Sequence, residues 1–161
     1  MFGSVVLALS LVATGATAEK AKKKRASSST ETRILVMDVS GDALSDEEKG
    51  VVREAITHGL QKQAKGAEVL STEELRKFAD VTASRQAADC DTEACLAEIG
   101  AALGAGRVVH ASVARLGARF VMNVSLIVAE RERALGRAAA EAADVAGLYD
   151  AVPDAVAELY G

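Results

Sequence analysis

An uninterrupted apolar run, RILVMDV at residues 33–39, constrains the fold more than any other segment of the chain. It ends at a Ser-Gly-Asp turn at 40–42, and a short apolar run bounded by turn residues predicts a strand buried on both faces. The next segment predicts a helix, because Ser45 and Glu48 form a capping box. Its apolar residues recur at helical spacing: Val52, Ala55, Ile56, Gly59 and Leu60. A doubly covered strand joined to an amphipathic helix predicts a layered α/β protein.

The middle of the chain predicts a second strand and two further helices. The strand is AEVLS at 67–71, and Ser71 with Glu74 forms a second capping box. The helix that follows presents the apolar residues Leu75, Phe78 and Ala79. A third helix is expected from Thr92 to Leu103, where the glycines of 104–106 end it.

The last third of the chain predicts an antiparallel meander and a closing helix. RVVHASVARLG at 107–117 and ARFVMNVSLIVAE at 118–130 alternate at period two, and a turn at Leu116-Gly117-Ala118 would pair them. The segment 133–141 fits either a third meander strand or an Ala-rich helix. Pro153 is expected to kink or split the closing helix. The apolar stripe of that helix comprises Val145, Leu148, Val152, Val156 and Leu159.

These segments predict the element order β-α-β-α-α-β-β-β-α. The fold class is α/β, in the α+β sense: a mixed sheet of about five strands with a late antiparallel meander and helices packed on it. One domain at 33–161 is expected from the length of this part. Because the chain has no Trp and only Phe78 and Phe120 lie beyond the amino-terminal apolar run, the core of this domain must be aliphatic.

The amino terminus predicts a secretory signal peptide at 1–18. An apolar run from Phe2 to Ala13 precedes Ala16-Thr17-Ala18, the small-x-small pattern after which signal peptidase cuts. Cleavage after Ala18 would release a periplasmic or secreted protein without a stable membrane span, whereas an uncleaved segment would act as an anchor. The basic, Ser-rich stretch 19–32 lacks large apolar side chains, so it is predicted to be a disordered linker.

The net charge argues against nucleic-acid binding. The chain carries a formal charge of −4 although its linker is basic, so the domain at 33–161 is more acidic than the chain as a whole. Nucleic-acid-binding domains present a basic face. No nucleic-acid partner is therefore expected.

The chain contains two cysteines, Cys90 and Cys95. Structural zinc takes four ligands, and His58 and His110 fall on separate predicted elements, so a zinc site would be incomplete. The cysteine spacing also differs from the C-x-x-C of thioredoxin-type redox sites. That leaves a structural disulfide or two free thiols. If Asp91 caps the helix, Cys90 lies outside it and can reach Cys95, so we predict a disulfide formed in an oxidising compartment.

A family resemblance rests on several of these segments taken together: RILVMDV, AEVLS, the capped TEEL helix, CDTEACLAEIGAALGAGRVVHASVARLG and FVMNVSLIVAE. In this succession the chain resembles the amino-terminal α/β domain of the TolB translocation protein and the related domain of the secretion channel CsgG. It is more similar to exported bacterial proteins built on that domain, in which a Cys pair precedes CLAEIG. The resemblance spans residues 33–160 and implies a non-enzymatic envelope domain that binds proteins or assembles into larger machines. It carries over no functional residue, and without a β-propeller or channel segment it carries over neither a Tol-linked nor a secretion-channel role.

Two motifs suggest ligand sites. Asp38-x-Ser40-x-Asp42 lies at the carboxyl end of the first strand, where α/β folds gather ligands. It is similar to the metal-binding D-x-S-x-S of von Willebrand factor A domains, and Mg²⁺ prefers such oxygens; a turn that caps the next helix is the alternative. The glycines of GAALGAG at 100–106 follow a helix instead of a strand, so they predict a helix stop and not a phosphate cradle.

No catalytic residue and no cofactor is predicted. His58 and His110 are expected to be partly buried structural residues, since no neighbour in the sequence completes an acid-base pair. We therefore predict a non-catalytic periplasmic envelope protein that acts as an interaction or assembly module on a protein partner. A divalent-metal-binding domain centred on Asp38, Ser40 and Asp42 is the alternative. For the partner, an unpaired sheet edge at 67–71 is a candidate for strand addition.

Overall fold

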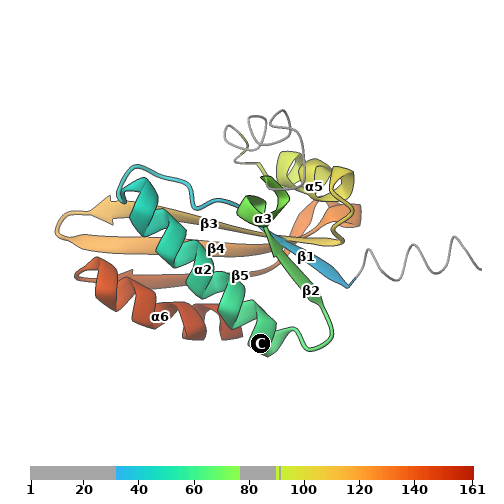
Figure 1. Ribbon diagram of the computed structural model, residues 1–161. Helices are drawn as coiled ribbons and strands as arrows, with labels where there is room; N and C mark the ends of the chain where they lie inside the picture. The colour runs from blue at the N-terminus through green and yellow to red at the C-terminus, as the bar shows by residue number, and fades with distance from the viewer. Residues whose placement is uncertain (1–31, 77–89, 91) are drawn as a thin grey trace, which may run out of the picture.

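The computed structural model describes residues 32–76, 90 and 92–161, which form a sheet of five strands with helices on both faces (Figure 1). The strand order is β2-β1-β3-β4-β5. β1 is parallel to its neighbours β2 and β3, whereas β3, β4 and β5 are successively antiparallel. The strands are β1 (Arg33–Val36), β2 (Glu68–Ser71), β3 (Arg107–Leu116), β4 (Arg119–Val128) and β5 (Arg133–Ala142). This mixed sheet with a late meander confirms the predicted fold class.

The helices lie in two layers. α2 (Asp46–Gln63) and α6 (Val145–Glu158) lie side by side on one face of the sheet, and α5 (Glu93–Ala102) covers part of the other (Figure 1). The short helix α3 (Thr72–Arg76) follows β2 directly, and the 3-10 turn η1 (Ala129–Arg131) joins β4 to β5. No helix in the described part of the chain is long and apolar enough to cross a membrane. The predicted signal peptide and all but the last residue of the predicted linker lie outside the described residues.

The alternation of side chains divides the core into two clusters. Ile34 and Leu35 are adjacent in β1 and almost fully buried, yet they belong to different clusters, as expected of a strand covered on both faces. The larger cluster lies between the sheet and helices α2 and α6, and the smaller one lies under α5. The smaller cluster contains Leu35, Met37, Cys90, Leu96, Ala97, Ala105, Val108 and Ile127. Among the described residues, the end of the meander at the turn between β3 and β4 is therefore covered on one face only.

A bulge ends the first strand earlier than predicted. The apolar run covers 33–39, but β1 stops at Val36. The N–H groups of Met37 and Ser40 donate to carbonyls of β3 residues that are only two apart, at 2.9 Å each. Between these two hydrogen bonds the segment after β1 advances by three residues, whereas β3 advances by two. A bulge of this kind changes the direction of the side chains within it. Asp38 lies inside the bulge, next to the candidate site.

The predicted helix starts are present, with one correction. Both capping boxes form, Ser45 with Glu48 and Ser71 with Glu74. The N-cap of α5 is Thr92, so the prediction that Asp91 caps this helix is wrong. Thr92 replaces it because its hydroxyl accepts the N–H three residues later, in the first turn. Phe78, Ala79 and Asp91 themselves lie outside the described residues.

Two later segments resolve an ambiguity and a wrong expectation. The segment 133–141 lies in strand β5, because the short turn η1 returns the chain alongside β4 and ladder pairing outweighs the helix propensity of alanine. Pro153 does not split the closing helix, and α6 is continuous through it. Proline removes the hydrogen bond to the carbonyl of Tyr149, and because both residues are exposed, water can satisfy that carbonyl.

The glycines at 100–106 make a helix stop, as predicted, and also a close joint between α5 and β3. α5 ends at Ala102, and Gly104 follows with φ of +69°, a conformation that favours glycine. A Cβ at Gly100 would lie 2.2 Å from Cγ2 of Val108, so this glycine lets α5 approach β3 closely.

Candidate functional site

A cavity of about 580 Å³ lies beyond the end of β1, beside β3 and the first turns of α2. β1 is the switch point of the sheet, since the chain leaves it for β2 on one side and β3 lies on the other. Ligands of α/β proteins bind in the crevice at such a point. The polar lining comprises Asp38, Ser40, Asp46, Lys49, Arg53 and His110.

Arg53 of α2 connects the charged groups at this cavity. Its side chain is only 13% exposed, and its Nη1 lies 2.7 Å from Oδ1 of Asp38. Its Nη2 pairs with the carboxylate of Glu73 in α3. The hydroxyl of Thr72 also donates to Oδ1 of Asp38, at 2.7 Å. A guanidinium between two carboxylates joins α2, α3 and the bulge, which is foremost a structural ion-pair network.

The predicted metal motif is only partly gathered at this cavity. Asp38 and Ser40 line it, whereas Asp42 is exposed and does not. The carboxylate of Asp38 already binds Arg53, and the hydroxyl of Ser40 faces the carbonyl of Ala111 at 3.4 Å. Among the described residues, no group of three His, Cys, Asp or Glu side chains is placed to hold a metal ion. The metal site therefore stays a prediction, which a thermal melt with Mg²⁺ or Mn²⁺ tests, because a ligand bound by the native state raises Tm.

The two histidines differ in position. His110 of β3 is half-buried and lines the cavity. His58 is exposed on α2, so the expectation that it is partly buried is wrong. The neighbouring Thr57 takes the buried position, where its hydroxyl donates to the carbonyl of Arg53 at 2.9 Å. The threonine hydroxyl can enter the core because the backbone of its own helix accepts its hydrogen bond.

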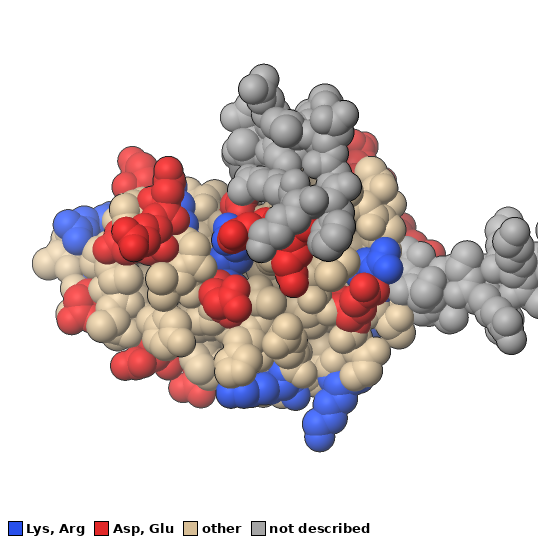
Figure 2. Space-filling view, in the orientation of Figure 1, with Lys and Arg blue, Asp and Glu red and all other residues tan. Residues whose placement is uncertain are grey.

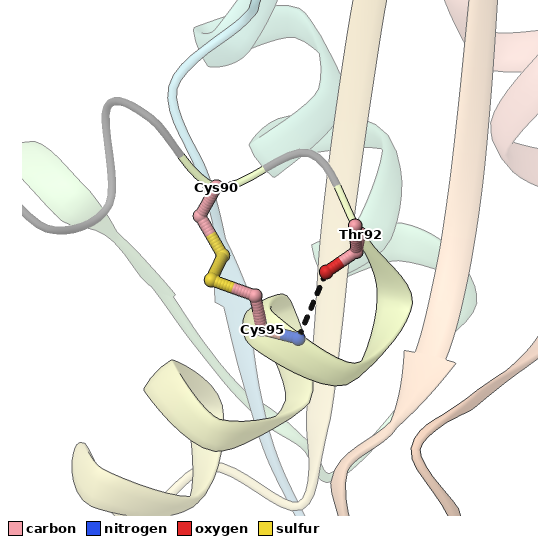
Figure 3. Close-up of a disulfide and its surroundings, with 3 residues drawn as sticks. All are labelled: Cys90, Thr92 and Cys95. Carbon is pink, nitrogen blue, oxygen red and sulfur yellow. Dashed lines mark hydrogen bonds between the residues drawn. A yellow bond between two sulfur atoms is a disulfide. The ribbon is translucent and has the colours of Figure 1, made fainter.

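Cys90 and Cys95 form a disulfide (Figure 3), and Cys90 lines the same cavity. Their Cα atoms are 5.8 Å apart. Cys90 precedes the helix and is buried in the smaller core cluster, while Cys95 lies in the first turn of α5. The N–H of Cys95 donates to Oγ1 of Thr92, at 3.3 Å. One short segment thus carries the N-cap of α5 and a covalent link to the loop before it.

Glu93 connects the start of α5 to β5, and the sequence did not reveal this contact. The backbone N–H of Ala134 donates to Glu93 Oε2 at 3.0 Å, and Arg137 pairs with the other carboxylate oxygen. These two donors, the backbone N–H first, hold the pKa of Glu93 below its usual value. The partners lie 41 and 44 residues away in the sequence, so no local pattern could predict them.

The two edges of the described sheet are β2 and β5. β2 occupies the edge predicted at 67–71, but it has only four residues. β5 has ten, and its outward-facing residues from Arg133 to Glu141 are exposed at every second position. On the face that α2 and α6 form, Figure 2 shows acidic and basic side chains interspersed with uncharged ones. Of the two edges of the described sheet, β5 is therefore the longer one.

The comparisons with known proteins support the fold and leave the family open. No family model matches the chain, and no curated protein does. Lipoprotein GNA1162 from Neisseria meningitidis is similar in structure, with a TM-score of 0.56 at 14% identity over 78% of this chain and 96% of that chain. The PelC dodecamer from Paraburkholderia phytofirmans has a TM-score of 0.51 at 10% identity, over 81% of this chain and 88% of that chain.

TolB from Acinetobacter baumannii also matches, over 81% of this chain and 28% of that chain, at 13% identity. Its TM-score of 0.48 is too low to support an argument. The expected resemblance therefore holds at the level of an α/β fold shared with a bacterial lipoprotein. The specific TolB and CsgG relationships stay predictions.

Proposed function

We propose that this chain is an exported, non-catalytic interaction or assembly module of the bacterial cell envelope. The observation that carries the proposal is the Cys90–Cys95 disulfide, because such bonds persist in oxidising compartments such as the periplasm. The predicted signal peptide at 1–18 supplies a route there. The fold similarities agree, since one similar structure is a lipoprotein and another is a dodecamer.

The cavity contributes to the fold more than to the function. Its charged side chains pair with each other, Arg53 with Asp38 and Lys49 with Asp46. We therefore assign the cavity charges to positioning the bulge and α2, and we assign the function to the surface.

Localisation and processing test this proposal directly. The full chain is expressed in a bacterium with a periplasm, the cells are fractionated, and the intact mass is measured with and without thiol alkylation. We expect a periplasmic protein cleaved after Ala18, with both cysteines blocked to alkylation. A chain with residues 1–18 deleted serves as the control and should stay in the cytosol. A full-length wild-type chain in the cytosol with two free thiols would contradict the proposal, and a full-length chain in the membrane fraction would support an uncleaved anchor.

A pull-down from envelope extract tests the interaction role. The processed protein, immobilised through a carboxyl-terminal tag, should retain the same envelope protein in repeated experiments. Protein unfolded by reduction and urea before immobilisation is the control and should not retain it. Equal retention by the folded and unfolded proteins would argue against an interaction module.

A further inference from the structure

We propose that the β5 edge binds a second copy of this chain, so that two sheets join across a two-fold axis at Ala139. This inference deepens the proposed function by naming the partner of one surface. It rests on the regular half of β5, residues 136–142, which lies beyond the register shift near Leu126 of β4. In the described sheet this half of the strand has β4 on one side only. It contains no Lys and no Pro, which are residues that commonly protect an edge from pairing.

The charge pattern of this segment is complementary to itself. Arg137, Ala139 and Glu141 alternate along the exposed face of β5. In an antiparallel pair centred on Ala139, each Arg137 lies opposite Glu141 of the second copy, and the two Ala139 residues meet at the axis. Both charged cross-strand pairs are then favourable, and no like charges lie directly opposite each other. This register follows from the residue order alone, whichever residues of the edge direct their N–H groups outward.

Neighbouring charges extend the same pattern. Arg137 already pairs with Glu93, and Glu141 lies 3.4 Å from Arg119. Across the proposed interface the four groups alternate in sign: Glu93, Arg137, then Glu141 and Arg119 of the second copy. Alternation of this kind fixes the register of an interface, because a shift of two residues would place Arg137 opposite Ala139 and break both pairs.

The helix that covers β5 leaves room for this arrangement. The residues of β5 that face α6 in this segment are all small, namely Gly136, Ala138, Ala140 and Ala142. α6 can therefore lie close to β5, and a Cβ at Gly136 would meet the carbonyl oxygen of Leu159 at 2.5 Å. Val156 of α6 contacts Gly59 of α2, so the flank of α6 directed away from α2 carries Gly147, Ala151, Asp154 and Glu158, about half a turn around the helix. α6 packs on the even-numbered residues of β5, whereas Arg137, Ala139 and Glu141 lie on the opposite face of the strand.

Charge reversal tests the register. In sedimentation velocity over a concentration series, the processed wild-type chain should show a reversible monomer–dimer equilibrium. Arg137→Glu and Glu141→Arg each place like charges opposite each other twice, so each should weaken dimerisation roughly tenfold or more. The double variant Arg137→Glu/Glu141→Arg restores both pairs between the copies, although each new charge then lies beside a like charge of its own copy, at Glu93 or Arg119. It should therefore dimerise more tightly than either single variant. A wild type that is monomeric throughout, or a double variant as weak as the single ones, would overturn the inference.

A cysteine at the axis provides an independent test. Opposite residues of an antiparallel pair have Cα atoms roughly 4.5–5.5 Å apart, within disulfide reach. Ala139→Cys should therefore form a symmetric intermolecular disulfide under mild oxidation, with mass spectrometry showing residue 139 linked to itself. Ala114→Cys, also exposed but on the interior strand β3, is the matched control and should crosslink far less. Equal crosslinking would contradict the axis, even if the charge variants had folded poorly.

These results separate the two proposals. A monomer that is nevertheless exported, oxidised and able to retain an envelope protein would overturn the second-copy inference alone. Retention of an envelope protein that Arg137→Glu abolishes in a monomeric chain would assign the β5 edge to a different protein. A dimeric chain that stays in the cytosol with free thiols would overturn the envelope proposal alone.

Discussion

Reduction of the Cys90–Cys95 disulfide should destabilise the domain by about 2 kcal/mol. The bond closes a small ring, since the two cysteines are five residues apart in the sequence. In the chain-entropy model, opening a ring of this size returns that amount of conformational freedom to the unfolded chain. The native state loses little, because Thr92 still caps α5 and Cys90 can stay buried as a thiol.

The assay is urea denaturation of the processed protein, oxidised and reduced, at one pH. We expect a lower midpoint after reduction and a fall in Tm of roughly 5–10 °C for a domain of this size. Cys90→Ala/Cys95→Ala should be less stable than the reduced wild type, because alanine leaves space where the buried sulfur of Cys90 lay. Equal stability of the oxidised and reduced proteins would refute the reasoning, since it would mean that the bond does not restrict the unfolded chain.

Three further predictions test the cavity and the start of α5. In urea denaturation, Gly41→Ala should lower the free energy of unfolding by about 2–4 kcal/mol more than the control Gly66→Ala. Both glycines have positive φ (100° and 84°), but only at Gly41 would a Cβ lie 2.1 Å from a carbonyl oxygen of β3. Equal losses of stability would contradict this close approach. Asp38→Asn should lower the free energy of unfolding by about 1–2 kcal/mol, since Arg53 keeps Glu73 as a carboxylate partner. The same substitution should cost much less in an Arg53→Met background. An unchanged cost in that background would argue against the Arg53–Asp38 pair. Because its pKa is lowered in the folded state, Glu93 stabilises the fold fully above the pKa of an unfolded Glu, about 4.3, and this contribution is lost as the pH falls through the lower folded-state pKa. Glu93→Gln should therefore reduce the loss of stability between these two pKa values. Identical dependence of stability on acid pH in the two proteins would contradict this reasoning.

Much of the fold followed from local patterns. The order of elements, both capping boxes and the glycine stop after α5 depend on residues within a few positions of each other, where spacing and side-chain chemistry carry the information. The same local logic placed Asp38 and Ser40 near the end of a central strand, beside the observed cavity. It could not place Asp42, which the turn leaves exposed.

The undecided and the wrong predictions arose where distant parts of the chain decide the outcome. The segment 133–141 has helix-favouring alanines, yet the open edge of β4 makes it a strand. The sequence carries no local signal for the role of Arg53, because its two carboxylate partners come from the bulge and from α3. His58 was expected to be partly buried, but the buried residue is its neighbour Thr57. Helical periodicity alone does not distinguish two neighbouring residues at the border of a buried stripe.

The sequence by itself determined the fold class, the helix caps and which strand is buried on both faces, because each depends on short-range periodicity and on hydrogen bonds between near neighbours. Only the tertiary structure decided the bulge at Asp38, the Glu93 contacts and the open β5 edge. These features come from pairing between segments tens of residues apart, where the hydrophobic pattern sets which face is buried but not which backbone groups are left without a neighbour.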